Sequence, residues 1–147
     1  MIRAHASCVA VDGAGVLLRG PSGCGKSDLC LRLIDDGAVL VADDQVLLAR
    51  GENGLVATCP PAISGRLEVR GLGIVPVPST ERAAVLLVVD LVPAAQVERL
   101  PPPRRCSVDD VDLPLIELAP FESSAPAKVR LALRSIATDS ATIGTPG

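Results

Sequence analysis

A short glycine-rich segment of the chain has the sequence Gly-Pro-Ser-Gly-Cys-Gly-Lys-Ser and matches the pattern G-x-x-x-x-G-K-[ST]. In such a loop, consecutive backbone N–H groups converge on phosphate oxygens, and the N-terminus of the next helix adds partial positive charge. An apolar stretch, Gly15 to Arg19, precedes the segment, and Lys26 to Asp36 follows it with Leu29 and Leu33 spaced for one helical face. A glycine-rich turn with an incidental lysine would lack this strand and helix, so the sequence predicts a phosphate-binding loop.

The last two residues of the loop have separate expected tasks. Lys26 is expected to reach the β and γ phosphates of a nucleotide, and Ser27 is expected to ligate Mg²⁺. The predicted nucleotide-binding residues are Gly20, Pro21, Ser22, Gly23, Cys24, Gly25, Lys26 and Ser27.

The pattern of apolar stretches indicates an α/β fold with a mixed sheet. Ser7–Val11 and Gly15–Arg19 flank the turn signal Asp12-Gly13-Ala14, which predicts a hairpin leading into the loop. Val39–Ala42 follows the predicted helix, so strand, loop, helix and strand form a crossover unit with parallel strands. Further strands are predicted at Val46–Ala49, Leu55–Ala57, Leu67–Arg70, Ile74–Val77 and Val85–Leu91.

The C-terminal part of the chain contains two local signals. Pro101-Pro102-Pro103 interrupts regular structure, and Ala125–Ile136 predicts a closing helix with one apolar face. We expect a single domain over residues 1–138 and a flexible tail over residues 139–147.

Composition excludes several classes of partner. The formal net charge is -3, and Phe121 is the only aromatic residue, so neither a basic surface nor a series of stacking platforms for nucleic acid is expected. The longest uninterrupted apolar run, Ala83–Val89, has seven residues, far below the ~20 that cross a bilayer. The five cysteines contain no C-x-x-C pair, which indicates a reducing compartment. We therefore expect a cytoplasmic protein that binds neither nucleic acid nor membrane.

Two adjacent aspartates, Asp43 and Asp44, end the strand predicted at Val39–Ala42, on the sheet edge that also carries the loop. An aspartate there can accept a bond from a magnesium-bound water or take a proton from an attacking hydroxyl. An isolated Asp-Asp pair would more simply form a solvated turn. Because neighbouring side chains of extended backbone point to opposite faces, the two are expected to have different roles.

The only histidine, His5, lies just before the predicted hairpin. The hairpin register places it level with Pro21 or Ser22, beside the phosphates, although a histidine near a terminus is commonly an exposed surface residue. Glu68 and Arg70 alternate with apolar residues on a predicted strand, which by itself indicates a solvated strand face.

Taken together, His5, Gly20–Ser27, Val41–Asp44 and Glu68–Ile74 resemble, in order and spacing, the catalytic domain of HPr kinase/phosphorylase. The resemblance covers about Ile2 to Val77. These enzymes use ATP and Mg²⁺ to phosphorylate a seryl hydroxyl of the phosphocarrier protein HPr in the sugar phosphotransferase system, and many reverse the reaction by phosphorolysis. The resemblance implies a P-loop-containing mixed sheet with flanking helices, similar to phosphoenolpyruvate carboxykinase, an HPr-like carrier as substrate, and a homo-oligomer that is a hexamer.

The same resemblance implies roles for individual residues. The loop lysine, the magnesium ligands, the family's active-site histidine and the aspartate that handles the serine proton all have counterparts in this chain, and Val97-Glu98-Arg99-Leu100 offers a candidate for a later active-site arginine. The predicted catalytic residues are His5, Lys26, Asp44 and Arg99, the predicted metal ligands are Ser27 and Glu68, and the supporting residues are Asp43, Arg70 and Gly71.

The chain also departs from the family pattern. Longer members have an N-terminal regulatory domain, and we expect this chain to resemble the short α-proteobacterial members that lack it. A basic loop linked to dephosphorylation is expected to be replaced by Ala119–Ser124, which leaves phosphorolysis open. Two alternatives follow: a nucleotide-sensing module that binds ATP without transferring its phosphate, and a kinase of small molecules.

Overall fold

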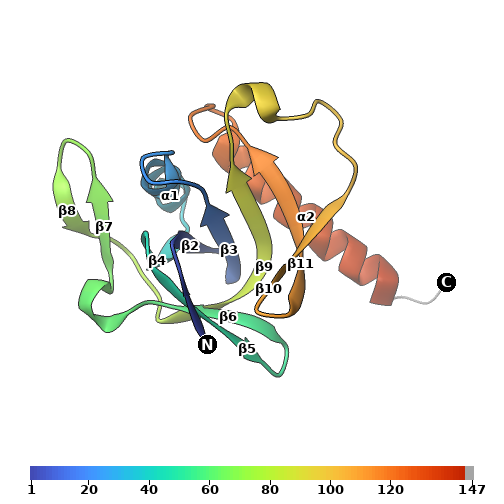
Figure 1. Cartoon of the computed structure of the whole chain (residues 1–147), viewed down its shortest axis with the longest axis horizontal. Coiled ribbons are helices and arrows are strands. Elements are labelled where there is room, and N and C mark those ends of the chain that lie inside the picture. The colour runs from blue at the N-terminus through green and yellow to red at the C-terminus, as the bar shows by residue number, and fades with distance from the viewer. Residues whose placement is uncertain (145–147) are drawn as a thin grey trace.

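The computed structural model describes residues 1–144 of the chain, with side chains described as far as Thr138. Over this range the chain forms a large curled sheet, a small separate hairpin and two α-helices (Figure 1). The strands are β1 (Ile2–Ala4), β2 (Ala6–Val11), β3 (Ala14–Arg19), β4 (Val39–Ala42), β5 (Val46–Gly51), β6 (Gly54–Thr58), β7 (Arg66–Val69), β8 (Gly73–Pro76), β9 (Arg82–Leu91), β10 (Arg104–Val108) and β11 (Val111–Leu118). The helices are α1 (Lys26–Asp35) and α2 (Ala125–Gly144), with short 3-10 turns η1 (Pro61–Ile63) and η2 (Ala94–Gln96).

The large sheet is mixed, as expected, and β3 lies between β2 and β9. β3 is parallel to β9, and β9 is parallel to β11. β2 is antiparallel to both β3 and β4, so β4 runs in the same direction as β3 with β2 between them. The predicted crossover unit is therefore present, and the C-terminal ends of β3, β4, β9 and β11 lie at one edge of the sheet. We call this the loop edge.

The hairpin that leads into the glycine-rich segment has a two-residue turn. Asp12 and Gly13 both have positive φ, 50° and 85°, as in the turns that match the twist of paired strands. Val11 pairs with Ala14, and Ala6 pairs with Arg19. The turn is one residue shorter than the predicted Asp12-Gly13-Ala14, because Ala14 already belongs to β3.

The C-terminal part of the chain contains more structure than predicted. β10 and β11 pair with each other, and β11 extends the sheet beside β9. At the other end of the chain β1 pairs with β5, which was also not predicted. α2 begins at Ala125 as expected but runs to Gly144, beyond the predicted end at Ile136. The predicted flexible tail therefore begins inside this helix, and its last part, residues 145–147, lies outside the described residues.

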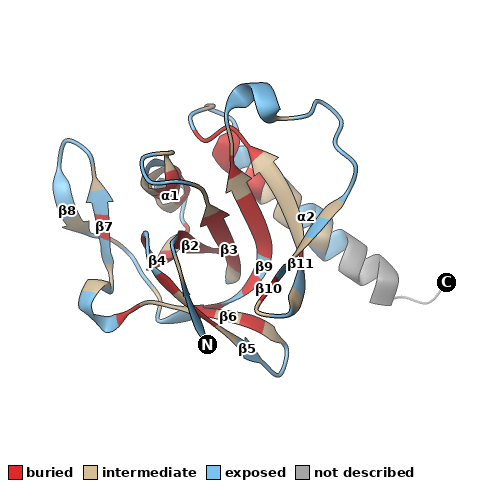
Figure 2. Cartoon of the chain, in the orientation of Figure 1, coloured by how far each residue is buried: buried red, intermediate tan, exposed pale blue. Residues whose placement is uncertain are grey.

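The large sheet is covered on both faces, and the most buried strands are at its centre (Figure 2). On one face α1 and α2 contribute Leu29, Leu33 and Val129 to a core with Val9 and Val16. On the other face the sheet curls onto itself, and the apolar residues come from strands, including Cys8, Leu17, Leu48, Leu55 and Val88. Successive residues of β2 and β3 belong to different cores, which explains why these strands are apolar throughout.

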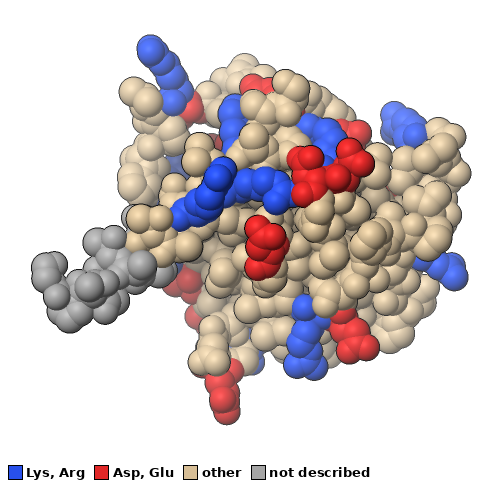
Figure 3. Space-filling view, turned by 180° about the vertical axis from the view of Figure 1, so that it is seen from behind, with Lys and Arg blue, Asp and Glu red and all other residues tan. Residues whose placement is uncertain are grey.

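Charged side chains of both signs are interspersed on the face seen from behind (Figure 3). No helix within the described residues combines the length and the apolar character needed to cross a membrane.

Candidate functional site

The glycine-rich segment Gly20–Ser27 connects the end of β3 to the start of α1 at the loop edge. Gly23 and Gly25 have positive φ, 77° and 111°, a backbone region that other residues adopt at a cost. Gly25 is the N-cap of α1, so the first N–H groups of the helix open into the loop. This is the arrangement that binds anions at a helix N-terminus.

The loop folds around Lys26. Its Nζ donates hydrogen bonds to the carbonyl oxygens of Gly20 at 2.7 Å and Pro21 at 3.1 Å, and the residue is only 5% exposed. The ammonium group is therefore held inside the curve of the loop by neutral carbonyl partners. A phosphate oxygen is a stronger partner, because a hydrogen bond between two charged groups is roughly twice as strong as one between neutral groups.

Gly25 offers the first test of the loop. A Cβ at this position would lie 2.9 Å from both the Phe121 Cζ and the Pro120 Cβ atoms. Gly25→Ala is therefore expected to lower the free energy of unfolding by about 1–3 kcal/mol and to weaken binding of Mg-ATP, as measured by urea unfolding and calorimetry. Gly37→Ala is the matched control, because Gly37 has a similar φ of 104° with no atom within 4 Å. Equal loss of ATP binding in both variants would contradict a specific role for the loop geometry.

Asp43 connects the loop to the neighbouring strands. Its Oδ1 accepts hydrogen bonds from the hydroxyls of Ser27 at 2.8 Å and Ser7 at 3.0 Å, and its Oδ2 accepts one from the backbone N–H of Glu68 at 3.3 Å. The carboxylate is buried. It therefore fixes the hydroxyl of Ser27, a predicted metal ligand, and ties β7 to the loop edge. Asp43 was predicted to have a supporting role only, and Ser7 was not predicted.

Asp44 is more accessible than its neighbour. Its side chain is 57% exposed, and its Oδ1 lies 3.0 Å from the His5 Nε2. The backbone has φ 66°, and its N–H donates to the Ser7 hydroxyl at 2.9 Å. The two aspartates thus face different surroundings, one buried against the loop and one open to solvent. That they have different roles stays a prediction.

His5 reaches the loop through Ser22. Its Nε2 lies 3.3 Å from the Ser22 Oγ. The strand register continues from the pair Ala6 and Arg19, which places His5 level with Gly20 and not with Pro21 or Ser22. The predicted register is therefore wrong by one or two positions, yet the side chain spans the difference.

Glu68, Arg70 and Gly71 lie on the hairpin of β7 and β8, a separate two-stranded sheet. Gly71 has φ 94° in the turn, and the side chains of Glu68 and Arg70 are exposed. Only the backbone of Glu68 contacts Asp43. The described residues contain no preformed group of three or more His, Cys, Asp or Glu side chains placed to hold a metal ion.

Arg99 is not brought into the site. It lies in the exposed segment between η2 and β10, and no hydrogen bond or ion pair within the described part of the chain joins it to the loop. Its neighbour Glu98 pairs with Arg104.

Two further residues at the loop edge, Arg19 and Asp90, were not predicted from the sequence. Arg19 donates to both carboxylate oxygens of Asp90, at 2.7 and 3.1 Å, and so ties the end of β3 to the end of β9. The same hydrogen bond raises the pKa of Arg19 above its ordinary value. A charged residue at the end of each apolar strand was the only sequence signal for this pair.

The buried thiols near the site are poor nucleophiles. Burial raises the pKa of Cys8 to about 12. Burial, with a smaller contribution from the charge of Asp43, also raises the pKa of Cys30. Since the thiolate is the reactive form, neither residue is suited to covalent chemistry at neutral pH.

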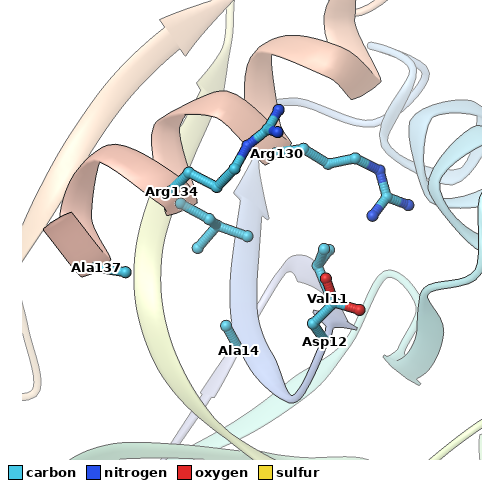
Figure 4. A pocket seen from close by; sticks show the side chains of 7 residues that line it. Val11, Asp12, Ala14, Arg130, Arg134 and Ala137 are labelled. Carbon is cyan, nitrogen blue, oxygen red and sulfur yellow. The ribbon is translucent and has the colours of Figure 1, made fainter.

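A hollow of about 420 Å³ lies at the opposite end of β2 and β3, between their turn and α2 (Figure 4). It is lined by Val11, Asp12, Ala14 and residues of α2, including Arg130 and Arg134. Arg130 is engaged there, because its guanidinium donates to the carbonyl oxygens of Leu33 and Asp36 at the end of α1. Because the hollow lies beside the turn of β2 and β3 and the C-terminal end of α1, it is remote from the loop edge.

Comparison with known proteins decides the family. The sequence model of the HPr Serine kinase C-terminal domain matches residues 1–100. The chain belongs to this family. An HPr kinase/phosphorylase from Prosthecochloris aestuarii is 39% identical over 126 residues, covering 78% of this chain and 37% of that protein. One from Clostridium tetani is 51% identical over 77 residues, covering 52% of this chain and 25% of that protein.

The fold of the HPr serine kinase domain is confirmed by a solved structure. The Hpr(Ser) kinase/phosphatase from Coxiella burnetii superposes with a TM-score of 0.84 at 27% sequence identity, covering 95% of this chain and 99% of that one. The resemblance and the fold class predicted from the sequence are therefore both correct. The chain spans only 25–37% of the length of the two curated relatives named above, and the roles of individual residues are considered next as proposals.

Proposed function

We propose that this chain is the catalytic domain of an ATP- and Mg²⁺-dependent protein-serine kinase whose substrate is an HPr-type phosphocarrier protein in the cytoplasm. The observation that carries the proposal is the position of Asp44. It is an exposed carboxylate at the loop edge, held by His5 at 3.0 Å and by a backbone hydrogen bond to Ser7. An accessible base beside a phosphate loop suits transfer to an incoming hydroxyl.

In the proposed reaction the loop amides and Lys26 bind the β and γ phosphates of ATP. The Asp44 carboxylate takes the proton of the seryl hydroxyl as the serine oxygen bonds to the γ phosphorus. The bond from that phosphorus to the β–γ bridging oxygen breaks, and ADP leaves. His5 orients Asp44 through its Nε2. That His5 or Arg99 stabilises charge on the transferred group stays a prediction, and of the two His5 lies beside the loop.

The oxygen donors at the loop edge fit Mg²⁺, which prefers carboxylate and hydroxyl oxygens and keeps several waters. Ser27 and Glu68 would hold the ion, and Asp43 would fix the Ser27 hydroxyl, to which it is already hydrogen-bonded. When bound, the ion offsets the negative charge of the β and γ phosphates.

The decisive experiment incubates the purified protein with Mg-ATP and the HPr-like carrier. We expect mass spectrometry to find one added phosphoryl group on a serine of the carrier. ATP binding without this product would favour a nucleotide sensor, and ATP turnover with metabolites but not with the carrier would favour a small-molecule kinase. Incubating the phosphorylated carrier with inorganic phosphate, and measuring pyrophosphate, tests the reverse reaction separately.

We also propose that copies of the chain assemble, as a hexamer according to the family resemblance. Support comes from large apolar side chains that are exposed in the single chain, including Leu72 at 75% and Ile74 at 69% on the β7–β8 hairpin. Light scattering on the purified protein measures the assembly directly.

A further inference from the structure

The segment between β11 and α2 lies against the phosphate loop. β11 ends at the loop edge beside β9, on the side of β3 away from β4. The Phe121 ring and Pro120 approach Gly25 so closely that a methyl group there would clash with both. β4 and β11 lie on opposite sides of β3 (Figure 1). The loop is thus flanked by Asp43 and Asp44, which follow β4, on one side and by Phe121, which follows β11, on the other.

Phe121 is a large apolar residue that lies mostly in solvent. It is the only aromatic residue of the chain, it is 69% exposed, and it belongs to neither apolar core. Pro120, directly before it, is buried. A large apolar ring held in water is unfavourable unless something covers it, and the loop beneath it gives the ring one fixed edge.

The backbone under Phe121 is fixed from both sides. The Arg32 guanidinium of α1 donates to the carbonyl oxygens of Pro120 and Glu122. The Glu122 carboxylate accepts a hydrogen bond from Lys128 at 2.6 Å. The ring is therefore presented by a backbone that is tied to the same helix whose N-terminus opens into the loop.

The direction of a bound nucleotide follows from the two flanks. Its γ phosphate must face Asp44, where the hydroxyl is deprotonated in the proposed reaction, so the nucleoside leaves the loop toward the opposite flank. We propose that Phe121 is the platform on which the nucleobase stacks. This inference rests on the proposed function only for that direction, and it assigns the base a place that the loop motif does not specify.

The first test distinguishes an effect of Phe121 on binding of the base from an effect on binding of the phosphates. Phe121→Ala and Phe121→Leu are expected to weaken Mg-ATP binding by about tenfold or more, since stacking of a base on an aromatic ring has effects of this order. Binding of Mg-tripolyphosphate, which has no base, is expected to stay unchanged, and both affinities are measured by calorimetry. Leu131→Ala is the matched control, because Leu131 is also a large apolar residue with 59% exposure but lies on α2.

The second test uses the absence of tryptophan from the chain. Phe121→Trp creates a single fluorophore whose emission is expected to be quenched by Mg-ATP and not by Mg-tripolyphosphate. Leu131→Trp, the control, is expected to respond to neither ligand.

The possible results distinguish the platform from the kinase. Unchanged ATP affinity in Phe121→Ala, or equal weakening of ATP and tripolyphosphate binding, overturns the proposal that Phe121 is the base platform. If Phe121→Ala selectively weakens ATP binding and the wild-type protein transfers no phosphate, the base platform is supported and the proposed function is contradicted. Wild-type protein that binds neither ligand overturns both.

Discussion

Replacing Asp44 by asparagine is expected to lower the rate of phosphate transfer to the carrier by about 10²–10⁴, while Mg-ATP binds with unchanged affinity. The amide keeps the shape of the side chain and cannot accept the seryl proton. Asparagine also tolerates the φ of 66° found at this position, so the backbone should not move. The rate is measured by mass spectrometry of the carrier, and the affinity by calorimetry.

Asp12→Asn is the matched control for this variant. Asp12 also has positive φ, 50°, but lies in the turn at the far end of β2 and β3, so its replacement should leave transfer unchanged. Near wild-type transfer by Asp44→Asn would remove this residue from the role of base. Loss of ATP binding together with transfer would instead indicate a structural role.

The elements around the loop could be predicted because their signals are local. The glycine positions, the helical face of Leu29 and Leu33, and the apolar strand before the loop all lie within a few residues of one another. The placement of Asp43 and Asp44 followed from one topological rule, since strands joined by a crossover helix end at the same edge.

β10 and β11 form a local hairpin around Asp109 and Asp110 that was not predicted. The pairing of β11 with β9, in contrast, is not local. β11 contains Pro114 and mixes half-buried with buried positions, so it shows neither the alternation nor the apolar run of a typical strand. Its partner β9 lies more than twenty residues earlier in the chain. Consequently the position of Phe121 beside Gly25 could not be read from the sequence.

The hydrogen-bond partners of Asp43 were also beyond the sequence. Ser7, Ser27 and Glu68 lie on three different elements, and only the folded sheet brings them to one carboxylate. A serine inside the otherwise apolar β2 was the available signal, because a buried hydroxyl needs a partner.

Because these hydrogen bonds converge on one carboxylate, replacing Asp43 should lower the stability of the fold strongly. The described side chains contain no buried nitrogen or oxygen atom without a hydrogen-bond partner. Asp43→Ala would leave the Ser27 hydroxyl and the Glu68 N–H without their acceptor, and Ser7 without one of its partners. A buried polar group left unsatisfied costs about 1–3 kcal/mol, so we expect the free energy of unfolding to fall by about 3 kcal/mol or more, as measured in urea.

The double variant Ser7→Ala/Asp43→Ala, compared with the two single variants, distinguishes effects on stability from effects on ATP binding. Ser7→Ala removes one donor to Asp43 and the acceptor of the Asp44 N–H, so its effect should not add to that of Asp43→Ala, because the two residues share one network. Asp43→Ala should also weaken Mg-ATP binding more than Ser7→Ala does, since only Asp43 contacts Ser27. Additive losses of stability, or equal ATP affinities in the two variants, would show that Asp43 does not couple the fold to the phosphate loop.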